Sequence, residues 1–368
     1  MVRERTSKRA VQQLIEWKPS EEKQNQNITT PFAPSLLDVS LKALAENAEG
    51  IVSLELVPDN LRRRLTDMLC DMRKMNLNVL NLLLQGCPTE IRIKNCSWLT
   101  DEQFQQTFRN CQTKDLRVLQ LDLCGQCMLD FAFRDALTHS SDSLSRLAIV
   151  SLRVAGIQTI SDQFVSEIIT VCGQSIKELD LADCLALTDC SLKTIGSNCA
   201  DLCALNIANL HNLTDLGLEY LANAFFVKTL QFHGLSDEAM AAFLECSGES
   251  LMELLLNNMT KVGPNTALSL AKHSRKLLSL DISWCRRITN EALGLIVDSC
   301  SSLKLLKVFG CRQITNVSLN GHSNPFVRII GLNLTPILDH VNLLEPEEVL
   351  LRYSPLTMSQ EVWNKEIC

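Results

Sequence analysis

Two stretches of the sequence share one pattern and decide the fold: IKELDLADCLALTDCSLKTIGSNC (residues 176–199) and LLSLDISWCRRITNEALGLIVDSC (residues 277–300). In each, apolar residues alternate with variable ones, a cysteine and a Thr-Asp or Thr-Asn pair follow, and an apolar stripe with helical spacing ends in a second cysteine. The alternation predicts a short strand with one buried face, and the stripe predicts an amphipathic helix. Such a recurring unit is typical of a repeat protein.

The unit recurs at a nearly constant interval along the chain. The middle apolar residues of the best-defined strands are 26, 25, 24, 26 and 26 residues apart, within the ~20–29 residues of a leucine-rich repeat. Because neither the strand nor the helix can bury its apolar face alone, the units must stack. We therefore expect an α/β leucine-rich-repeat solenoid of about ten repeats over residues 86–335, with parallel strands on the concave face and helices on the convex face. The strand landmarks are Ile91, Leu119, Val150, Leu179, Leu205, Leu230, Leu254, Leu280, Leu306 and Ile330.

Polar residues and cysteines keep fixed places in the repeat. We expect an Asp or Asn at the start of each helix to accept a hydrogen bond from the first free N–H groups of that helix. These residues are Asp101, Asp162, Asp189, Asp215, Asp237, Asn290 and Asn316. Ten cysteines fall into register and are expected to be small buried residues. Five follow a strand landmark by five positions (Cys96, Cys124, Cys184, Cys285 and Cys311), and five close a helix (Cys111, Cys172, Cys199, Cys246 and Cys300).

Composition limits the classes of function. Hydrophobic residues make up 46% of the 368 residues, which is enough for an extended core. The net charge of −7 argues against broad attachment to nucleic acid. No apolar run approaches the ~18 residues of a membrane span. The first twenty residues contain no apolar stretch of the kind found in secretory signals, so free thiols in a reducing compartment are expected.

Motifs for catalysis and for metal binding are weak. Cys124-Gly-Gln-Cys127 has the spacing of a zinc-binding pair, but no second pair lies at suitable spacing and Cys124 already has a place in the repeat. The sequence has no Gly-rich phosphate loop, H-E-x-x-H or G-x-S-x-G motif, and its six histidines are scattered. We therefore predict a binding protein without metal, cofactor or enzymatic activity, and rank a hydrolase or metal enzyme far lower.

The segments outside the repeats differ in character. Residues 1–33 are polar and predict a flexible tail, whose basic residues could contact nucleic acid or an import receptor, although a solvated tail is the favoured reading. Residues 34–85 have helical spacing and would cap the first repeat, dock an adaptor by a helix-in-groove contact, or do both. Residues 336–368 are expected to cover the last repeat.

The repeat resembles the cysteine-containing leucine-rich repeats of F-box/LRR proteins, which are non-catalytic substrate receptors of cullin–RING ubiquitin ligases. A clear F-box is absent, and residues 35–76 resemble most the Rad-seven type proteins of nucleotide excision repair. That resemblance implies an elongin-C-binding box with Leu36, Ser40 and Leu44 at its anchor positions, Ser standing where the family has Cys, and we include Leu41 in the docking set. The adaptor would be elongin-C-like or Skp-like and would carry a cullin, and the protein would act in the nucleus, or also in the cytoplasm. A repair scaffold that binds a damage-recognition partner without a ligase role is the alternative.

The concave face is the expected binding surface for a protein substrate, because the variable residues of each strand point away from the core. No strong direct binding to nucleic acid and no membrane contact are expected. Trp284 and Phe309 are the expected anchors, since aromatic residues concentrate binding energy at interfaces. The predicted partner-binding residues are Lys177, Asp180, Gln231, His233, Asn257, Asp281, Trp284, Lys307 and Phe309, with Glu178 and Ser283 beside them.

Overall fold

A computed structural model describes residues 35–109, 115–123, 149–222, 229–231, 234–315, 317 and 321–331. The expected polar tail at 1–33 and the expected C-terminal cap at 336–368 lie outside these residues. The chain divides into two compact units, Met1–Ala43 and Leu44–Cys368. Helix α2 (Leu36–Glu46) runs across the division.

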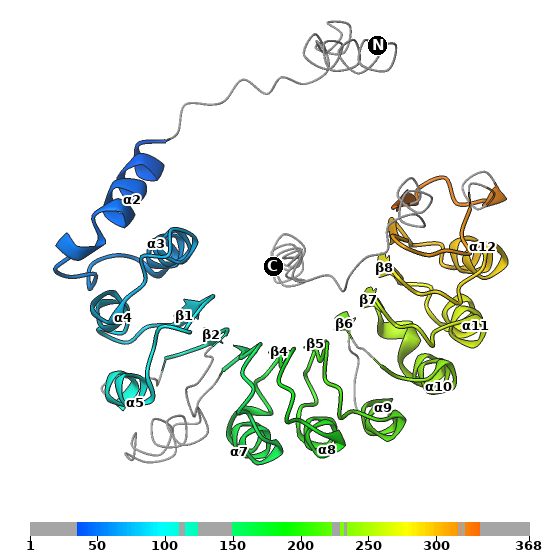
Figure 1. Ribbon diagram of the computed structural model, residues 1–368, viewed down its shortest axis with the longest axis horizontal. Helices are drawn as coiled ribbons and strands as arrows, with labels where there is room; N and C mark the ends of the chain where they lie inside the picture. Colours follow the sequence, from blue (N-terminus) through cyan, green and yellow to red (C-terminus); the bar gives the residue numbers. More distant parts are fainter. Residues whose placement is uncertain are drawn as a thin grey trace, which may run out of the picture. The chain divides into compact units, whose positions relative to one another are not determined.

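The second unit is built on one parallel sheet. Among the described residues it has ten strands, and each strand lies beside the preceding one in chain order (Figure 1). The strands are β1 (Glu90–Ile93), β2 (Val118–Leu121), β3 (Ser151–Arg153), β4 (Glu178–Asp180), β5 (Ala204–Asn206), β6 (Thr229–Gln231), β7 (Glu253–Leu255), β8 (Ser279–Asp281), β9 (Leu305–Lys307) and β10 (Arg328–Ile330).

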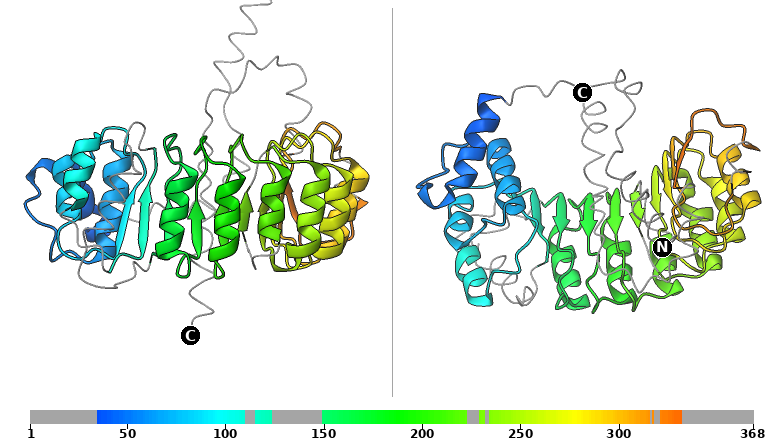
Figure 2. Two further views of the ribbon diagram at one scale, coloured as in Figure 1. Left: turned by 90° about the horizontal axis from the view of Figure 1, so that it is seen from below. Right: turned by 45° about the horizontal axis from the view of Figure 1, so that its top comes forward.

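A layer of helices covers one face of this sheet. Figures 1 and 2 show the strands along the inner curve of the second unit and the helices along its outer side. The repeat helices are α5 (Asp101–Arg109), α7 (Asp162–Cys172), α8 (Asp189–Asn198), α9 (Asp215–Ala222), α10 (Asp237–Ser247), α11 (Pro264–His273) and α12 (Asn290–Ser299). Before β1 come α3 (Asp59–Asp71) and α4 (Leu77–Leu83), and short 3-10 turns occupy Ala48–Gly50 and Gly248–Ser250.

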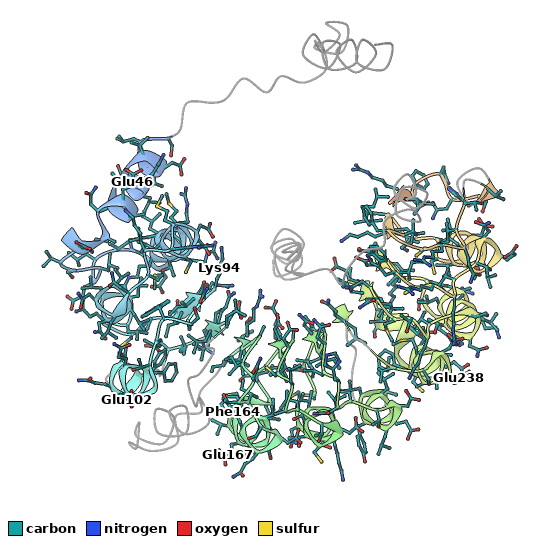
Figure 3. The ribbon with its side chains drawn as sticks, in the orientation of Figure 1. Glu46, Lys94, Glu102, Phe164, Glu167 and Glu238 are labelled. Atoms are coloured by element: carbon teal, nitrogen blue, oxygen red, sulfur yellow. The ribbon has the colours of Figure 1, made fainter. Side chains whose placement is uncertain are left out.

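The core lies between the two layers and is aliphatic. The strand register places Leu179 opposite Leu205 and Leu205 opposite Leu230, and all three side chains are buried. Figure 3 shows Phe164 of α7 between sheet and helix, while Glu167 and Glu238 point outward. This is the expected leucine-rich-repeat solenoid, with one continuous interior shared by neighbouring repeats.

Two strand landmarks are shifted from their predicted positions. Leu119 pairs with Leu152 rather than Val150, and Leu306 pairs with Ile329 rather than Ile330. The first shift is two residues, and period-two alternation cannot detect it because both positions face the same side of a strand. The second occurs in the last described strand, where Ile329 and Ile330 are both half-buried and give no alternation.

The helix starts differ from the expected capping scheme. The Ser or Thr before the Asp or Asn caps its own helix: Ser161 accepts from Phe164 N and Thr289 accepts from Ala292 N. The Asp or Asn instead reaches the next repeat. Asp189 accepts hydrogen bonds from the backbone N–H (2.9 Å) and hydroxyl (2.5 Å) of Thr214, which begins the following helix. Equivalent bonds run from Thr188 to Asp162, from Ser236 to Asp215, from Thr266 to Asp237 and from Thr315 to Asn290. Asp101 has no described side chain and Asn316 lies outside the described residues.

The cysteine ladder also links neighbouring repeats. The thiol of Cys285 donates to the carbonyl oxygen of Leu256 (3.0 Å), and that of Cys311 donates to the carbonyl oxygen of Ile282 (3.0 Å), each in the preceding repeat. Cys184 does the same to Val154 O at 3.2 Å. The repeat cysteines within the described residues are buried, apart from the exposed Cys246, and every described cysteine is a free thiol. Cys111, Cys124 and Cys127 lie outside the described residues.

The helices before β1 are joined to the sheet by polar contacts. The α3 carboxylate of Asp59 accepts from the Thr89 hydroxyl (2.5 Å), and Lys94, directly after β1, pairs with Asp67 of α3 (3.0 Å). The guanidinium of Arg62 donates to the backbone carbonyls of Val57, Glu55 and Gln85. These contacts cover the side of β1 that has no preceding repeat.

In the part of the chain that is described, no helix has the length and apolar content needed to cross a membrane.

Candidate partner-binding surface

The strand residues that face away from the core form a polar surface. In β8, Leu280 is buried while Ser279 and Asp281 are half-exposed. Because β8 and β9 are in register, Asp281 lies beside Lys307, and Lys307 Nζ is 3.6 Å from Asp281 Oδ2. Two of the predicted binding residues are thus brought together as an ion pair on this surface.

An ionic cluster crosses β2, β3 and β4. The Arg153 guanidinium lies 3.3 Å from Asp180 Oδ2 and 3.7 Å from Asp122 Oδ2. Burial raises the pKa of Asp122 to about 6 and raises that of Asp180, and Arg153 opposes both shifts. Asp122 Oδ1 is buried without a hydrogen-bond partner. Asp180, predicted to contact a partner, is only 3% exposed and holds Arg153 instead, so that prediction is corrected.

Trp284 and Phe309 lie in the turns that follow β8 and β9, half-buried. Trp284 has a left-handed backbone, with φ +65°, which is an outlier for a bulky residue. A Cβ added at Gly310 would lie 2.4 Å from Cε3 of Trp284, so the indole covers this glycine. Phe309 lies against Gly331 of the next turn with both its backbone and its ring, the backbone N being 2.6 Å and Cγ 2.8 Å from the added Cβ. The two aromatic residues therefore occupy successive turns at one edge of the sheet.

The left-handed conformation recurs at one position of the repeat, four residues after the central strand leucine. Most of the residues there are the types that tolerate it, and their recurrence was a sequence signal for this turn. The residues are Leu123, Gly156, Asp183, Asn209, Gly234, Asn258, Trp284 and Gly310. Four exposed basic residues on the same edge, Lys261, Arg286, Arg287 and Arg312, were not among the predicted binding residues. The Arg-Arg pair directly after Cys285 was their signal.

The remaining predicted partner residues lie on or beside the strands. Lys177, Glu178 and Gln231 are half-buried, and Ser283 is buried. Asn257 is half-buried, and its Oδ1 is enclosed without a hydrogen-bond partner. His233 lies outside the described residues.

Helix α2 carries the predicted adaptor-docking residues. Leu36 is 82% exposed and Leu44 is 43% exposed. Ser40 lies between them and is also exposed, and its hydroxyl donates a hydrogen bond to the carbonyl oxygen of Leu36 at 2.8 Å. Residues four apart lie on one side of a helix, so these three form one exposed stripe. Leu41 is 3% exposed and is therefore not accessible as an anchor, which corrects the expectation for this residue.

The described residues offer little for chemistry on a small molecule. None of their His, Cys, Asp and Glu side chains form a group of three suited to a metal ion. A small hollow lies between α3 and β1, lined by Arg62, Arg63, Glu90 and Arg92 among others. Burial raises the pKa of the Cys184, Cys199 and Cys300 thiols to about 12, which keeps them protonated.

Comparison with known proteins shows similarity to leucine-rich-repeat proteins. The family model described as "Leucine Rich repeat" matches residues 273–297. DNA repair protein rhp7 of Schizosaccharomyces pombe is 23% identical over 286 residues, covering 77% of this chain and 45% of that protein. F-box protein SKIP1 of Arabidopsis thaliana is 23% identical over 181 residues, covering 49% of each. The expected resemblance to F-box/LRR and DNA-repair repeat proteins is thereby confirmed, although this chain spans at most about half the length of these relatives.

Solved structures also resemble the chain. The crystal structure of the yeast Rad7 and Elc1 complex contains a chain with 16% identity and a TM-score of 0.43, with coverage of 80% of this chain and 91% of that one. The leucine-rich-repeat protein LegL7 from Legionella pneumophila has 17% identity and a TM-score of 0.43, with coverage of 67% and 83%.

Proposed function

We propose that the chain is a non-catalytic substrate-recognition subunit of a cullin–RING E3 ubiquitin ligase. In this proposal α2 docks an elongin-C-like or Skp-like adaptor, and the solenoid holds a protein substrate while other subunits transfer ubiquitin. The process served is ubiquitin-dependent protein degradation, in the context of nucleotide excision repair and in the nucleus. Similarity to a DNA repair protein and to an F-box protein supports this assignment.

The observation that carries the adaptor proposal is the exposed stripe on α2. Leu36, Ser40 and Leu44 follow at intervals of four residues, and both leucines project apolar surface into solvent. An apolar stripe of this spacing suits a helix-in-groove contact, in which the stripe enters an apolar groove of the partner. Ser40 interrupts the stripe with a hydroxyl, so adaptor affinity is expected to be lower than with an apolar residue there.

Adaptor binding is tested with a double variant, Leu36→Asp plus Leu44→Asp. Buried carboxylates would disrupt the contact, so recovery of purified elongin C or of a Skp-type adaptor should fall at least tenfold. Val52→Asp plus Leu56→Asp is the matched control, because these residues are 88% and 98% exposed and lie outside α2. Ser40→Cys should raise adaptor recovery. Equal recovery with both double variants would exclude α2 as the docking site.

A repair scaffold without a ligase role is the second candidate, favoured by the similarity to a DNA repair protein. The two functions differ in whether a cullin is recruited. Affinity purification of the whole chain from cells would recover a cullin through the adaptor if the ligase proposal holds. Recovery of repair partners with neither adaptor nor cullin would favour the scaffold.

A further inference from the structure

The C-terminal repeats carry a charge opposite to that of the rest of the chain. Residues 259–331 contain ten Lys and Arg and three Asp and Glu, a net charge of +7. Since the whole chain has a net charge of −7, the remaining residues carry −14. A segment of this charge acts as a local attractor for anionic groups, and it does so within about one Debye length, roughly 8 Å at physiological salt.

Four of these basic residues lie on one edge of the sheet, in the turns after β7, β8 and β9. They are Lys261, Arg286, Arg287 and Arg312, and all four are exposed. The turns are neighbours in space: Gln313 Nε2 donates to Arg286 O at 2.9 Å, and a Cβ added at Gly263 would lie 3.3 Å from Cβ of Arg287. We call these four residues with Trp284 the basic ridge.

Trp284 is held at the centre of the basic ridge at an energetic cost. The backbone N–H of Trp284 donates to the carbonyl oxygen of Phe309 at 2.6 Å, which joins the turn after β8 to the turn after β9. A bulky residue in the left-handed region costs about 1–3 kcal/mol and persists only where the surroundings impose it. At the same position Asn209 and Asn258 have φ of 59° and 64°, so a residue better suited to this backbone was available. Leu123 is also left-handed at this position and covers Gly156 as Trp284 covers Gly310, so a large apolar side chain here has a packing role. Trp284 differs in placing half-buried aromatic surface beside exposed arginines.

The acidic residues near the basic ridge are few. Asp281 faces the concave surface, where Lys307 pairs with it. Glu291 and Glu238 are exposed in the first turns of α12 and α10. The buried Asp237 carboxylate also lies here, 3.5 Å from a Cβ added at Gly263. The amino ends of α11 and α12 lie on this edge as well, where the Asp237 carboxylate accepts the first N–H groups of α11 and the Thr289 hydroxyl accepts from Ala292 N of α12. The five basic residues of the opposite edge have an exposed aromatic neighbour in Phe326, 80% exposed, but it does not have a left-handed backbone. These residues are Lys272, Arg275, Lys276, Lys304 and Arg328.

We propose that the basic ridge binds a short acidic segment of a partner protein, with the four basic side chains pairing its carboxylates and Trp284 contacting an apolar side chain within it. Arginine forms bidentate pairs with carboxylates, and a partly exposed tryptophan supplies apolar surface. A short peptide suits the charge distribution better than an extended nucleic acid does, because a long polyanion would pass from the basic ridge to repeats whose charge repels it. The inference rests on the proposed function only in that the solenoid binds a protein, and it does not involve α2.

The test measures binding of a labelled ten-residue peptide, with six Glu, one Leu and three Gly, to the whole chain without adaptor. A triple variant should weaken the affinity for this peptide at least tenfold; it carries Arg286→Ser, Arg287→Ser and Arg312→Ser. The matched control is Lys272→Ser, Arg275→Ser and Lys276→Ser, which removes the same charge from the opposite edge of the same repeats and should change the affinity less than twofold. Equal weakening by both triple variants, or no binding by the unaltered chain in 50 mM salt, would overturn the proposal.

Trp284→Asn tests the aromatic contact without damaging the turn, since Asn already occupies the equivalent position in two repeats. The melting temperature should not fall, while the preference for the Leu-containing peptide over one with Gly in its place should be lost. Retention of that preference would refute the role of Trp284. Tighter binding of a ten-residue oligodeoxythymidine than of the peptide would assign the basic ridge to nucleic acid. Leu36→Asp plus Leu44→Asp should leave peptide binding unchanged, which separates this test from that of the adaptor site.

Discussion

Asp237→Ala should be among the most destabilising single changes at the surface between two repeats. Asp237 is the first residue of α10 and is 7% exposed. Its carboxylate accepts four hydrogen bonds from the start of the next repeat helix: from Gly263 N (2.8 Å), Asn265 N (3.0 Å), Thr266 N (3.0 Å) and the Thr266 hydroxyl (2.6 Å). Helix α11 begins after Gly263, which has no side chain to cap it. Asp237 therefore caps the helix of the following repeat.

The magnitude follows from what the substitution leaves behind. Three of the four hydrogen bonds, from Gly263 N, Thr266 N and the Thr266 hydroxyl, are buried, and a buried donor without an acceptor costs about 1–3 kcal/mol. With the loss of the cap, we expect a decrease of about 3–5 kcal/mol in the free energy of unfolding. The control is Asp215→Ala, because Asp215 accepts one exposed bond, from Ser236 N at 3.0 Å. It should cost about 0.5–1.5 kcal/mol.

Repeat arrays need not unfold in one step, so the assay should resolve regions. Native-state hydrogen exchange of the α11 amides should show the full decrease in the free energy of unfolding in Asp237→Ala and little change in that free energy in Asp215→Ala. The pKa of Asp237 is lowered, because hydrogen bonds from Thr266, Gly263 and Asn265 outweigh the effect of burial. Its contribution to stability is thus complete at neutral pH and is lost as pH falls through the folded-state pKa, so the two variants should converge in acid. Equal losses at neutral pH would refute the bridging role.

Three further predictions concern the core and the turns. Burial raises the pKa of Asp122 to about 6, so ionisation of this carboxyl opposes folding as the pH rises. Relative to the unaltered chain, Asp122→Asn should therefore gain about 2–3 kcal/mol of stability as the pH is raised from 4 to 8. A difference in urea midpoints that does not change with pH would contradict this. Gly310→Ala, at φ +66° and against the Trp284 ring, should cost about 1–3 kcal/mol, and a double-mutant cycle with Trp284→Asn should recover part of it in thermal unfolding. Iodoacetamide at pH 8 should modify the exposed thiols of the folded protein and the buried thiols only after unfolding, as read by mass spectrometry. Labelling of any buried thiol in the folded protein would contradict the ladder of thiol–carbonyl bonds. Among the described residues the exposed thiols are Cys87, Cys190 and Cys246, and the buried ones are Cys96, Cys172, Cys184, Cys199, Cys285, Cys300 and Cys311.

The repeat could be predicted because its signals are redundant. Alternation, spacing and the turn cysteine all place Leu179 and Leu280 at the centre of a strand, and both residues are buried there. Where only alternation was available, as at Val150, the predicted register slipped by two residues. Period-two patterns fix which face a residue occupies but not where along the strand it pairs.

The binding surface was less predictable because its properties depend on neighbouring repeats. Asp180 has the sequence position of a surface residue, but Arg153 of the preceding strand draws it into a buried ion pair. The sequence pattern predicted that Asp237 caps its own helix. The sequence shows which residues are adjacent along the chain, but not which side chains meet between stacked repeats. The strain at Trp284 and the adjacency of Arg286, Arg287 and Arg312 likewise appear only when the turns are stacked.

The side-chain bonds between repeats that involve the helix starts and the turn cysteines have a direction. A carboxylate or amide of one repeat receives the first N–H groups of the next helix, and the thiols of Cys285 and Cys311 donate backward to carbonyls already in place. A newly synthesised repeat that emerges from the ribosome thus meets a finished neighbour that offers acceptors for both groups, so the array is suited to growth in the order of translation. Loss of the final repeats would leave the cap and thiol bonds among the earlier repeats intact and would free only backbone donors such as the Trp284 N–H, whereas loss of an early repeat would remove the acceptors that the next helix start and turn cysteine need.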